Sequence, residues 1–176
     1  MKDKNLFLIG MMGSWKSTVG RKLAATLDMK FIDTDDAIEE MTEMKIADIF
    51  REFDEKRFRE METAFFVEKS KQSGYVFSTG GGIVLSAKNR KVLKENGTTF
   101  LLDAFPKTLT DRIHNTSKRP LLADSDNLED RLKTIWKDRS ELYKNSAHHI
   151  IKTDKLKPAQ VLDEILKILE VPVADH

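Results

Sequence analysis

Five short strand-like segments alternate with helical patterns along this chain, and the alternation constrains the fold more than any other feature. The segments are residues 5–9, 30–33, 75–78, 98–103 and 148–153, and β-branched or aromatic residues are frequent in each. The last helical pattern, at residues 158–169, places its apolar residues on one face. Such alternation predicts right-handed β-α-β crossovers and a parallel sheet covered by helices on both faces. Ligands of this architecture bind beyond the carboxyl ends of the strands, so we expect the functional residues there.

Length and composition exclude several classes of protein. The 176 residues suit one compact domain, and 30 Lys and Arg against 29 Asp and Glu leave no bulk charge to recruit a nucleic acid or a membrane. The absence of cysteine excludes disulfides, thiol nucleophiles and cysteine-ligated metals. No apolar run is long enough for a membrane span or a signal peptide. We therefore expect a single-domain, monomeric protein of the cytoplasm.

The loop after the first strand nearly matches the phosphate-binding pattern G-x-x-x-x-G-K-[ST]. Gly10 begins it, Lys16 is placed to reach the β and γ oxygens of a nucleotide, and Ser17 is placed to ligate Mg²⁺. Successive backbone N–H groups at the positive end of the following helix would surround the phosphates. The match lies between a strand and a helix that extends to about residue 27, which is the context that this pattern requires. An accidental match in a strand-to-helix turn is therefore the weaker interpretation.

Trp15 occupies the position of the second glycine in this pattern. The backbone approaches the phosphates most closely here, so a side chain risks both a clash and an unfavourable conformation. A left-handed conformation alone costs a non-glycine residue roughly 1–2 kcal/mol, which would leave the fold intact but weaken nucleotide binding about tenfold or more. We interpret the loop as a degraded or altered phosphate site. Stacking of Trp15 on an adenine is the weaker interpretation, because the side chain would have to reach from the phosphate end to the base.

Two aspartates follow the second strand-like segment closely. Asp33 and Asp35 are two residues apart and point to the same side if the backbone is still extended there. One carboxylate can hold Mg²⁺ through its water shell, and the other can accept the proton of a hydroxyl nucleophile. The alternative is that either aspartate caps the next helix, with Asp36 and Glu39 favourable to the helix dipole. Capping would explain one of the two carboxylates well, but hardly both.

A predicted helix at residues 54–70 carries an arginine beside its apolar stripe. The stripe consists of Phe58, Met61 and Phe65. Arg59 adjoins it, and Glu62 is within reach for an ion pair on the same face. Exposed Arg–Glu pairs are common on surface helices, so the residues alone favour a structural role for this pair.

A second arginine and a run of glycines also suggest a binding site. On a predicted helix at residues 127–143, Arg139 lies about 20° around the axis from the apolar Leu128. A cation on an apolar face needs a counter-ion, and a substrate carboxylate, Glu62 or another acidic side chain can supply it. Glycines 80–82 follow a strand, and they are costly to order unless a small molecule needs backbone N–H groups at close range. A plain flexible turn is the alternative for these glycines.

Six motifs in order along the chain resemble those of the shikimate kinase family, and they cover nearly its whole length. The motifs are residues 10–18, 31–35, 46–50 with 58–62, 78–82, 119–122 and 139–143. The resemblance implies a three-layer α/β P-loop kinase fold, with a five-stranded parallel sheet in the order 2-3-1-4-5. It also implies a substrate-binding subdomain at about residues 34–61 and a mobile lid at about residues 113–126. The implied reaction moves the γ-phosphate of ATP to the 3-hydroxyl of shikimate, giving shikimate 3-phosphate and ADP in aromatic amino acid biosynthesis.

The resemblance also implies the roles of individual residues. Those expected to bind the nucleotide are Gly13, Ser14, Trp15, Lys16, Ser17, Thr18, Arg112 and Arg119. Those expected to bind shikimate are Asp35, Arg59, Gly80, Gly81, Gly82 and Arg139. The expected Mg²⁺ ligands are Ser17 and Asp33, the latter through water. The expected catalytic residues are Lys16, which holds the phosphates, Asp35, which receives the hydroxyl proton, and Arg119, which covers the transferring phosphate.

Two departures from the family pattern and two rival functions accompany this expectation. Asp54 replaces a glycine that is common in the family, and Leu156 stands where family members often place a basic residue near the adenine. One rival is a different small-molecule P-loop kinase, such as a gluconate kinase, but two arginines and three glycines suit a compact carboxylic acid better. The other rival is a binder that keeps the acid site and has lost phosphoryl transfer through Trp15.

Overall fold

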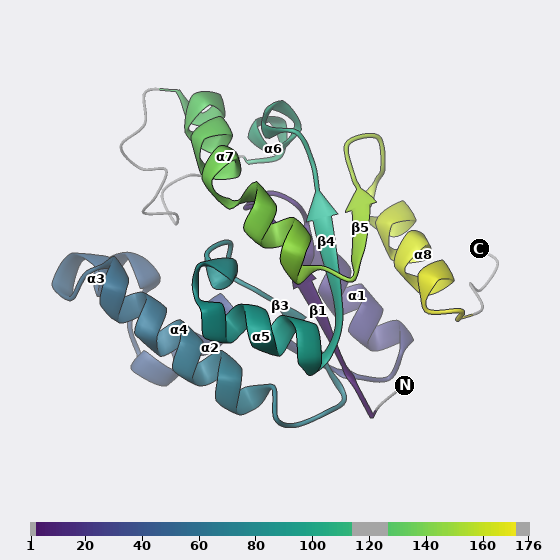
Figure 1. Cartoon of the computed structure of the whole chain (residues 1–176), viewed down its shortest axis with the longest axis horizontal. Coiled ribbons are helices and arrows are strands. Elements are labelled where there is room, and N and C mark those ends of the chain that lie inside the picture. The colour runs from purple at the N-terminus through teal and green to yellow at the C-terminus, as the bar shows by residue number, and fades with distance from the viewer. Residues whose placement is uncertain (1–2, 114–126, 172–176) are drawn as a thin grey trace.

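Figure 1 shows a computed structural model of the chain, which describes residues 3–113 and 127–171. A five-stranded parallel sheet forms its centre, with the strand order β2-β3-β1-β4-β5. The strands are β1 (Asn5–Ile9), β2 (Lys30–Asp33), β3 (Tyr75–Ser78), β4 (Gly97–Asp103) and β5 (His149–Lys152). The sheet and its order are therefore the expected ones.

Helices cover both faces of the sheet and complete the three layers (Figure 1). They are α1 (Lys16–Thr26), α2 (Thr34–Thr42), α3 (Ile46–Glu52), α4 (Glu55–Lys69), α5 (Ala87–Glu95), α6 (Pro106–Arg112), α7 (Leu128–Ser146) and α8 (Pro158–Ile168), with a short 3-10 helix η1 (Ile83–Leu85). One core lies between the sheet and helices α1 and α8, and the other between the sheet and helices α4 to α7. None of the helices within the described ranges is both long and apolar enough to span a membrane.

The central strand β1 contributes to both cores. Leu6 and Leu8 pack into the core beside α1 and α8, whereas Phe7 and Ile9 pack into the opposite core. All five residues of the strand are buried, because helices cover it on both sides. The parallel alignment brings the carboxyl ends of β1, β2 and β3 to the same edge of the sheet.

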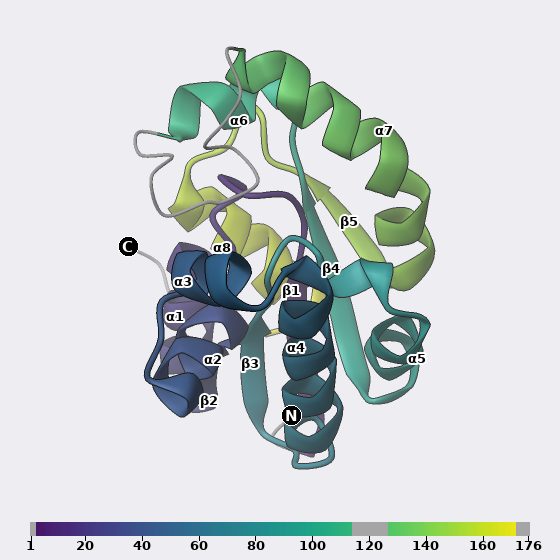
Figure 2. The same ribbon diagram turned by 90° about the vertical axis from the view of Figure 1, so that its left-hand side faces the viewer.

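A third, smaller core joins α2, α3 and α4 beside the sheet (Figure 2). Its buried members are Ile38, Ile49 and Phe58, one from each helix. This unit begins at the end of β2 and includes the first turn of α4, so it coincides with most of the region 34–61 that we expected to form a subdomain. Its part in substrate binding stays a prediction.

The buried face of α4 differs from the predicted stripe. The structure buries Phe58, Glu62 and Phe66, whereas Met61 and Phe65 are only half-buried. The predicted stripe is therefore confirmed at Phe58 and in part at Met61, which packs against the core that contains Phe58, and it is wrong at Phe65. The reason is that Glu62 turns inward to pair with Arg59. The buried residues Phe58, Glu62 and Phe66 are therefore four positions apart along the helix.

Asp54 has a backbone conformation that normally requires glycine. Its φ is 133° and its ψ is 173°, a region that costs other residues about 1–3 kcal/mol. The Asp54 carboxylate also caps α4, because its Oδ1 accepts a hydrogen bond from the backbone N–H of Arg57 at 2.8 Å. The strain and the cap therefore act in opposite directions on stability.

We expect Asp54→Gly to raise the free energy of unfolding by about 1 kcal/mol. Glycine relieves the strain, and at an N-cap it loses only a few tenths of a kcal/mol relative to aspartate. Asp54→Ala is the matched control: it keeps the strain, loses the cap and is expected to lower stability by about 1 kcal/mol. Urea denaturation of the three proteins measures both effects, and a stability loss in Asp54→Gly would contradict the strain argument.

Candidate active site

The carboxyl ends of three neighbouring strands open into one cavity of about 950 Å³. Its wall includes Gly13, Trp15, Lys16, Ser17 and Thr18 after β1, Asp33 and Asp35 at the end of β2, and Gly80, Gly81 and Gly82 after β3. Arg59 from α4, Arg112 from α6 and Arg139 from α7 complete it. The cavity therefore brings together most of the residues that the sequence indicated.

The phosphate loop holds its tryptophan in a left-handed conformation. Trp15 has φ 68° and ψ 18° and is the last residue before α1, so the strain expected from the sequence is present. Lys16 is 8% exposed, and its Nζ donates hydrogen bonds to the carbonyl oxygens of Gly10 and Met11, both at 2.9 Å. The ammonium group thus lies inside the loop, where a phosphate would be bound.

The side chain of Trp15 stacks on Arg112. The guanidinium carbon of Arg112 is 3.4 Å from the centroid of the Trp15 ring, a close cation–π contact. Arg112 also donates hydrogen bonds to Oγ1 and O of Thr153, at 3.0 and 2.6 Å. The indole therefore extends from the phosphate loop to Arg112, the residue that the resemblance places near the base. This reach of the side chain is longer than the sequence suggested.

Ser17, Asp33 and Ser78 form a group of oxygen atoms beside the loop. Ser17 Oγ donates a hydrogen bond to Asp33 Oδ2 at 2.5 Å and lies 3.1 Å from Ser78 Oγ. Hydroxyl and carboxylate oxygens are the ligands that Mg²⁺ prefers, so this group fits the metal. The other oxygen of Asp33 accepts a hydrogen bond from the backbone N–H of Asp35 at 3.1 Å and caps α2. The capping interpretation of Asp33 is therefore confirmed, and its role toward Mg²⁺ stays a prediction.

Asp35 is half-buried, and one of its oxygens is enclosed without a partner. Among residues 3–113 and 127–171, Asp35 Oδ1 accepts no hydrogen bond, and neither does Glu62 Oε1. Each of these oxygens lies 2.6 Å from the point where a side chain on Gly80 would begin. Loss of hydration, together with the nearby carboxylates of Glu62 and Asp33, raises the pKa of Asp35 to about 7. A carboxylate with such a pKa is suited to accept a proton from a hydroxyl group.

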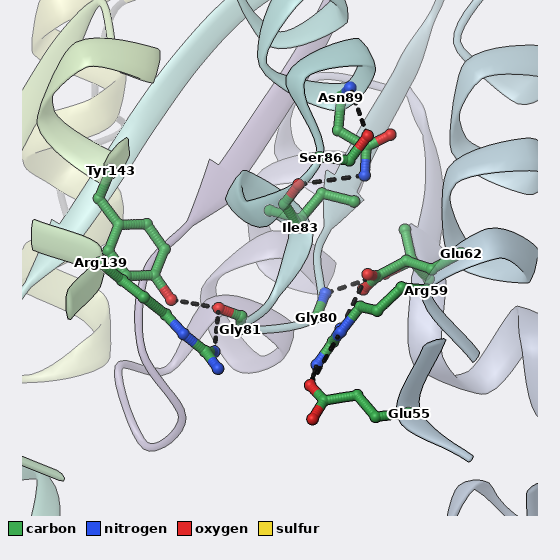
Figure 3. Close-up of polar contacts among 11 residues, drawn as sticks. Glu55, Arg59, Glu62, Gly80, Gly81, Ile83, Ser86, Asn89, Arg139 and Tyr143 are labelled. Atoms are coloured by element: carbon green, nitrogen blue, oxygen red, sulfur yellow. Dashed lines mark hydrogen bonds and ion pairs between the residues drawn. The ribbon is translucent and has the colours of Figure 1, made fainter. Parts of the chain in front are cut away.

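Arg59 and Glu62 form the ion pair that their spacing predicts (Figure 3). Arg59 Nη1 is 2.8 Å from Glu62 Oε2, and Nη2 is 3.2 Å from Glu55 Oε1, one turn earlier on α4. Gly82 makes room for the guanidinium, because a side chain there would begin 2.2 Å from its carbon atom. The two glutamates and the glycine thus fix Arg59 in the cavity wall.

Arg139 lies on the other side of the glycine segment, on α7. Its Nη1 donates to the carbonyl oxygen of Gly81 at 3.2 Å, and the hydroxyl of Tyr143 donates to the same oxygen (Figure 3). Within the described ranges no carboxylate is in ion-pair distance of Arg139, and Glu62 and Glu55 are paired with Arg59. Of the counter-ions that the sequence allowed for Arg139, neither Glu62 nor another acidic side chain of the described residues is therefore its ion-pair partner.

Comparisons with known proteins agree with this geometry. Residues 12–170 match the model of a family described as "Shikimate kinase". The chain belongs to the shikimate kinase family. It is 42% identical, over 163 residues, to the shikimate kinase of Sulfurihydrogenibium sp. (strain YO3AOP1), and the match covers 93% of this chain and 96% of that protein.

Solved structures of shikimate kinases are similar over nearly the whole chain. A shikimate kinase from Acinetobacter baumannii in complex with shikimate has a TM-score of 0.91 and 35% identity, covering 95% of this chain and 93% of that one. The shikimate kinase from Aquifex aeolicus has a TM-score of 0.81 and 31% identity, covering 94% and 96%. A gluconokinase from Sinorhizobium meliloti reaches only 0.58 with 16% identity, covering 96% and 93%, which shows a shared fold alone. The family match therefore favours shikimate kinase over the gluconate kinase alternative.

Three residues that support this shikimate kinase site had no role in the sequence analysis. Glu55 holds Arg59, Tyr143 holds the Gly81 carbonyl, and Thr34 Oγ1 accepts a hydrogen bond from the Gly80 N–H at 2.9 Å. Burial raises the pKa of Tyr143 to about 12, so its hydroxyl stays protonated and keeps donating. Helix spacing is the signal that was available, since Glu55 and Tyr143 each lie one turn from an arginine of the cavity wall.

Two expected nucleotide-binding residues are not placed in the cavity wall. Ser14 is buried behind the loop, and its backbone N–H donates to the carbonyl of Met11 at 3.3 Å. Its expected contact with the nucleotide stays a prediction. Arg119 lies outside the described residues, as does the expected lid at about residues 113–126 except for its first residue.

Replacement of one glycine should disturb substrate binding far more than replacement of its neighbour. A Cβ at position 82 would overlap the Arg59 guanidinium, whereas a Cβ at position 81 would meet its nearest atom at an ordinary 3.7 Å. We expect Gly82→Ala to raise the KM for shikimate about tenfold or more, because Arg59 must leave its ion pairs. Gly81→Ala, the matched control, should change the KM by less than about threefold. Steady-state assays measure both, and equal effects would contradict this account of Gly82.

Proposed function

We propose that the chain transfers the γ-phosphoryl group of ATP to the 3-hydroxyl of shikimate, giving shikimate 3-phosphate and ADP. The activity class is that of the shikimate kinase family to which the chain belongs. The observation that carries the proposal is the position of two guanidinium groups in the wall of the cavity into which the phosphate loop opens. Arg139 has no carboxylate partner among the described residues, and the carboxylate of shikimate would supply one.

The phosphate loop would bind the triphosphate. Lys16 now bonds to two carbonyl groups of the loop, and the same ammonium would bind the β and γ oxygens. Backbone N–H groups at the start of α1 would receive the remaining charge. Ser17 and Asp33 would hold Mg²⁺, directly and through water, and the ion would neutralise charge on the transferring phosphate.

Asp35 would orient the hydroxyl and receive its proton. The hydroxyl oxygen attacks the γ-phosphorus, the bond from that phosphorus to the β–γ bridging oxygen breaks, and ADP leaves with the electron pair. The raised pKa of Asp35 matches a proton acceptor that operates near neutrality. The enclosed oxygen of Asp35 lies beside Gly80. Gly80 belongs to the segment between Arg59 and Arg139, where the ring of the acid would lie.

Arg59, Arg139 and the glycines 80–82 would fix the acid. Both guanidinium groups extend to the same side of the Gly80–Gly81 segment (Figure 3), so one carboxylate can be bound between them. Arg119 would cover the transferring phosphate from the lid, and this role rests on the resemblance to the family alone.

A second candidate function is a shikimate binder with weak or absent phosphoryl transfer. Trp15 favours it, because the residue is strained and its side chain occupies part of the cavity wall beside the loop. The binding of acid and the binding of nucleotide use separate residues, so one can persist without the other.

A paired assay tests the proposal. The chain and its Trp15→Gly variant are assayed for ATP-dependent formation of shikimate 3-phosphate and ADP, with shikimate affinity measured separately by calorimetry. Product formation by the chain itself supports the kinase, and shikimate binding by the chain without product, whether or not Trp15→Gly forms product, supports the binder. Absence of shikimate binding in both proteins would overturn the proposal.

A further inference from the structure

The stack of Trp15 on Arg112 lies within the wall of the cavity that receives the phosphate loop. The edge of the Arg112 guanidinium is occupied by its two hydrogen bonds to Thr153. What the group can still offer to a flat ring is its planar face. The indole occupies a face at 3.4 Å, which is the contact distance of stacked planar groups.

A nucleobase is also a flat aromatic ring, and it would use the same kind of contact. The phosphates of a nucleotide in the loop would lie beside Lys16 and Ser17, so its base must extend along the cavity wall from there. Trp15 immediately precedes Lys16 and contacts Arg112. Arg112 is therefore the planar cation of that wall nearest to Trp15. The indole and a base cannot stack on one guanidinium face at the same time.

We propose that Trp15 determines donor specificity by occupying the stacking face of Arg112, so that this chain recognises its phosphoryl donor by the phosphates and gains little from the base. The inference rests on the proposed use of ATP. It assigns Trp15 a role distinct from backbone strain in the phosphate loop. Strain would weaken the binding of every polyphosphate, whereas the occupied face weakens only the contribution of the base.

The experiment separates the two effects with a donor that has no base. Dissociation constants for ATP and for inorganic tripolyphosphate are measured by calorimetry in the wild type, in Trp15→Ala and in Trp15→Gly. The ratio of the tripolyphosphate constant to the ATP constant reports the contribution of the base. Alanine removes the ring and keeps a non-glycine residue in the left-handed conformation, whereas glycine removes the ring and the strain.

We expect the ratio to rise roughly 2- to 30-fold in Trp15→Ala, the range of a single cation–π contact. Trp15→Gly should show the same rise, with an additional gain in affinity shared equally by both ligands. Arg112→Lys in the Trp15→Ala background should remove the rise, because an ammonium has no planar face. Trp136→Phe is the matched control, since the other tryptophan of the chain stacks on Tyr143 and should leave the ratio unchanged.

A second measurement keeps the native Trp15. In Trp136→Phe, Trp15 is the sole tryptophan, so its fluorescence reports the stack directly. ATP and tripolyphosphate should change its accessibility to acrylamide equally, because the indole keeps the face of Arg112 in both complexes, and exposure of the indole by ATP alone would contradict the inference.

Two calorimetric results would overturn the inference. One is an unchanged ratio in Trp15→Ala, because an equal gain for both ligands would place the effect in the phosphate loop. The other is a lower ratio, which would make the indole part of the base site. The proposed function fails by a different result, the absence of shikimate phosphorylation in every variant that binds ATP. The two failures are therefore distinguishable.

Discussion

Asparagine in place of Asp35 is expected to lower kcat for shikimate phosphorylation by about 10²- to 10⁴-fold, the usual contribution of a general base. The same substitution is expected to stabilise the fold. Asp35 Oδ1 is enclosed beside Glu62 Oε1, and among the described residues neither oxygen accepts a hydrogen bond. Two carboxylates held in this way repel each other when both are ionised. The site thus keeps an unfavourable charge that the reaction needs.

The stability gain should depend on pH with a definite sign. In the protein without nucleotide or metal, the pKa of Asp35 is about 7, against about 3.9 in an unfolded chain. Between these values the folded state holds a proton that the unfolded chain has released, so this group makes the free energy of unfolding fall as the pH rises from about 4 to about 7. Asparagine has no such proton. We expect Asp35→Asn to exceed the wild type by about 1–4 kcal/mol at pH 8 and to match it near pH 4.

Urea denaturation at several pH values, in EDTA and without nucleotide, measures this difference. The matched control is Asp111→Asn, because Asp111 has a 66% exposed side chain and a single surface contact with Lys107 at 3.7 Å. Its effect should stay within about 0.5 kcal/mol at every pH. A gain for Asp35→Asn that is the same at pH 4 and pH 8 would show that the pKa of Asp35 is not raised.

The fold was accessible from the sequence because local patterns and burial agree along most of the chain. The strands β1, β2 and β3 have the predicted bounds, β4 begins one residue earlier than predicted, and β5 is one residue shorter at each end. The stripe on α4 is the instructive error. Apolar periodicity treats Glu62 as a surface residue, but the ion pair with Arg59 compensates its charge and allows it to be 1% exposed.

The site was predictable where its residues are close in sequence. The pairing of Arg59 with Glu62 and the position of Asp33 at the end of β2 follow from local spacing. Contacts between distant segments were not predictable in this way. The stack of Trp15 on Arg112 and the closeness of Gly82 to Arg59 depend on how α6 and α4 pack against the strand ends. The residue types gave no sign of either contact.

The second large effect is expected at Arg139. Arg139→Gln should lower kcat/KM for shikimate by about 10²- to 10³-fold, as expected when one partner of an enclosed charge pair is removed. Its effect on stability should be within about 0.5 kcal/mol, because the guanidinium has no ion pair among the described residues and an amide can donate to the Gly81 carbonyl in its place. Lys137→Gln removes an exposed charge from the same helix and should leave both quantities unchanged.

The methyl ester of shikimate shows whether Arg139 acts on the carboxylate. Wild type should convert the neutral ester poorly, and Arg139→Gln should cause little further loss, because the charge that Arg139 would pair with is already gone. Arg139→Lys should recover part of the activity toward the acid, since it restores the charge but not the bidentate geometry. Losses of equal size for the acid and the ester would mean that Arg139 acts on the phosphates instead. In that case the unpaired guanidinium would belong to the nucleotide half of the cavity, and Arg59 alone would bind the acid.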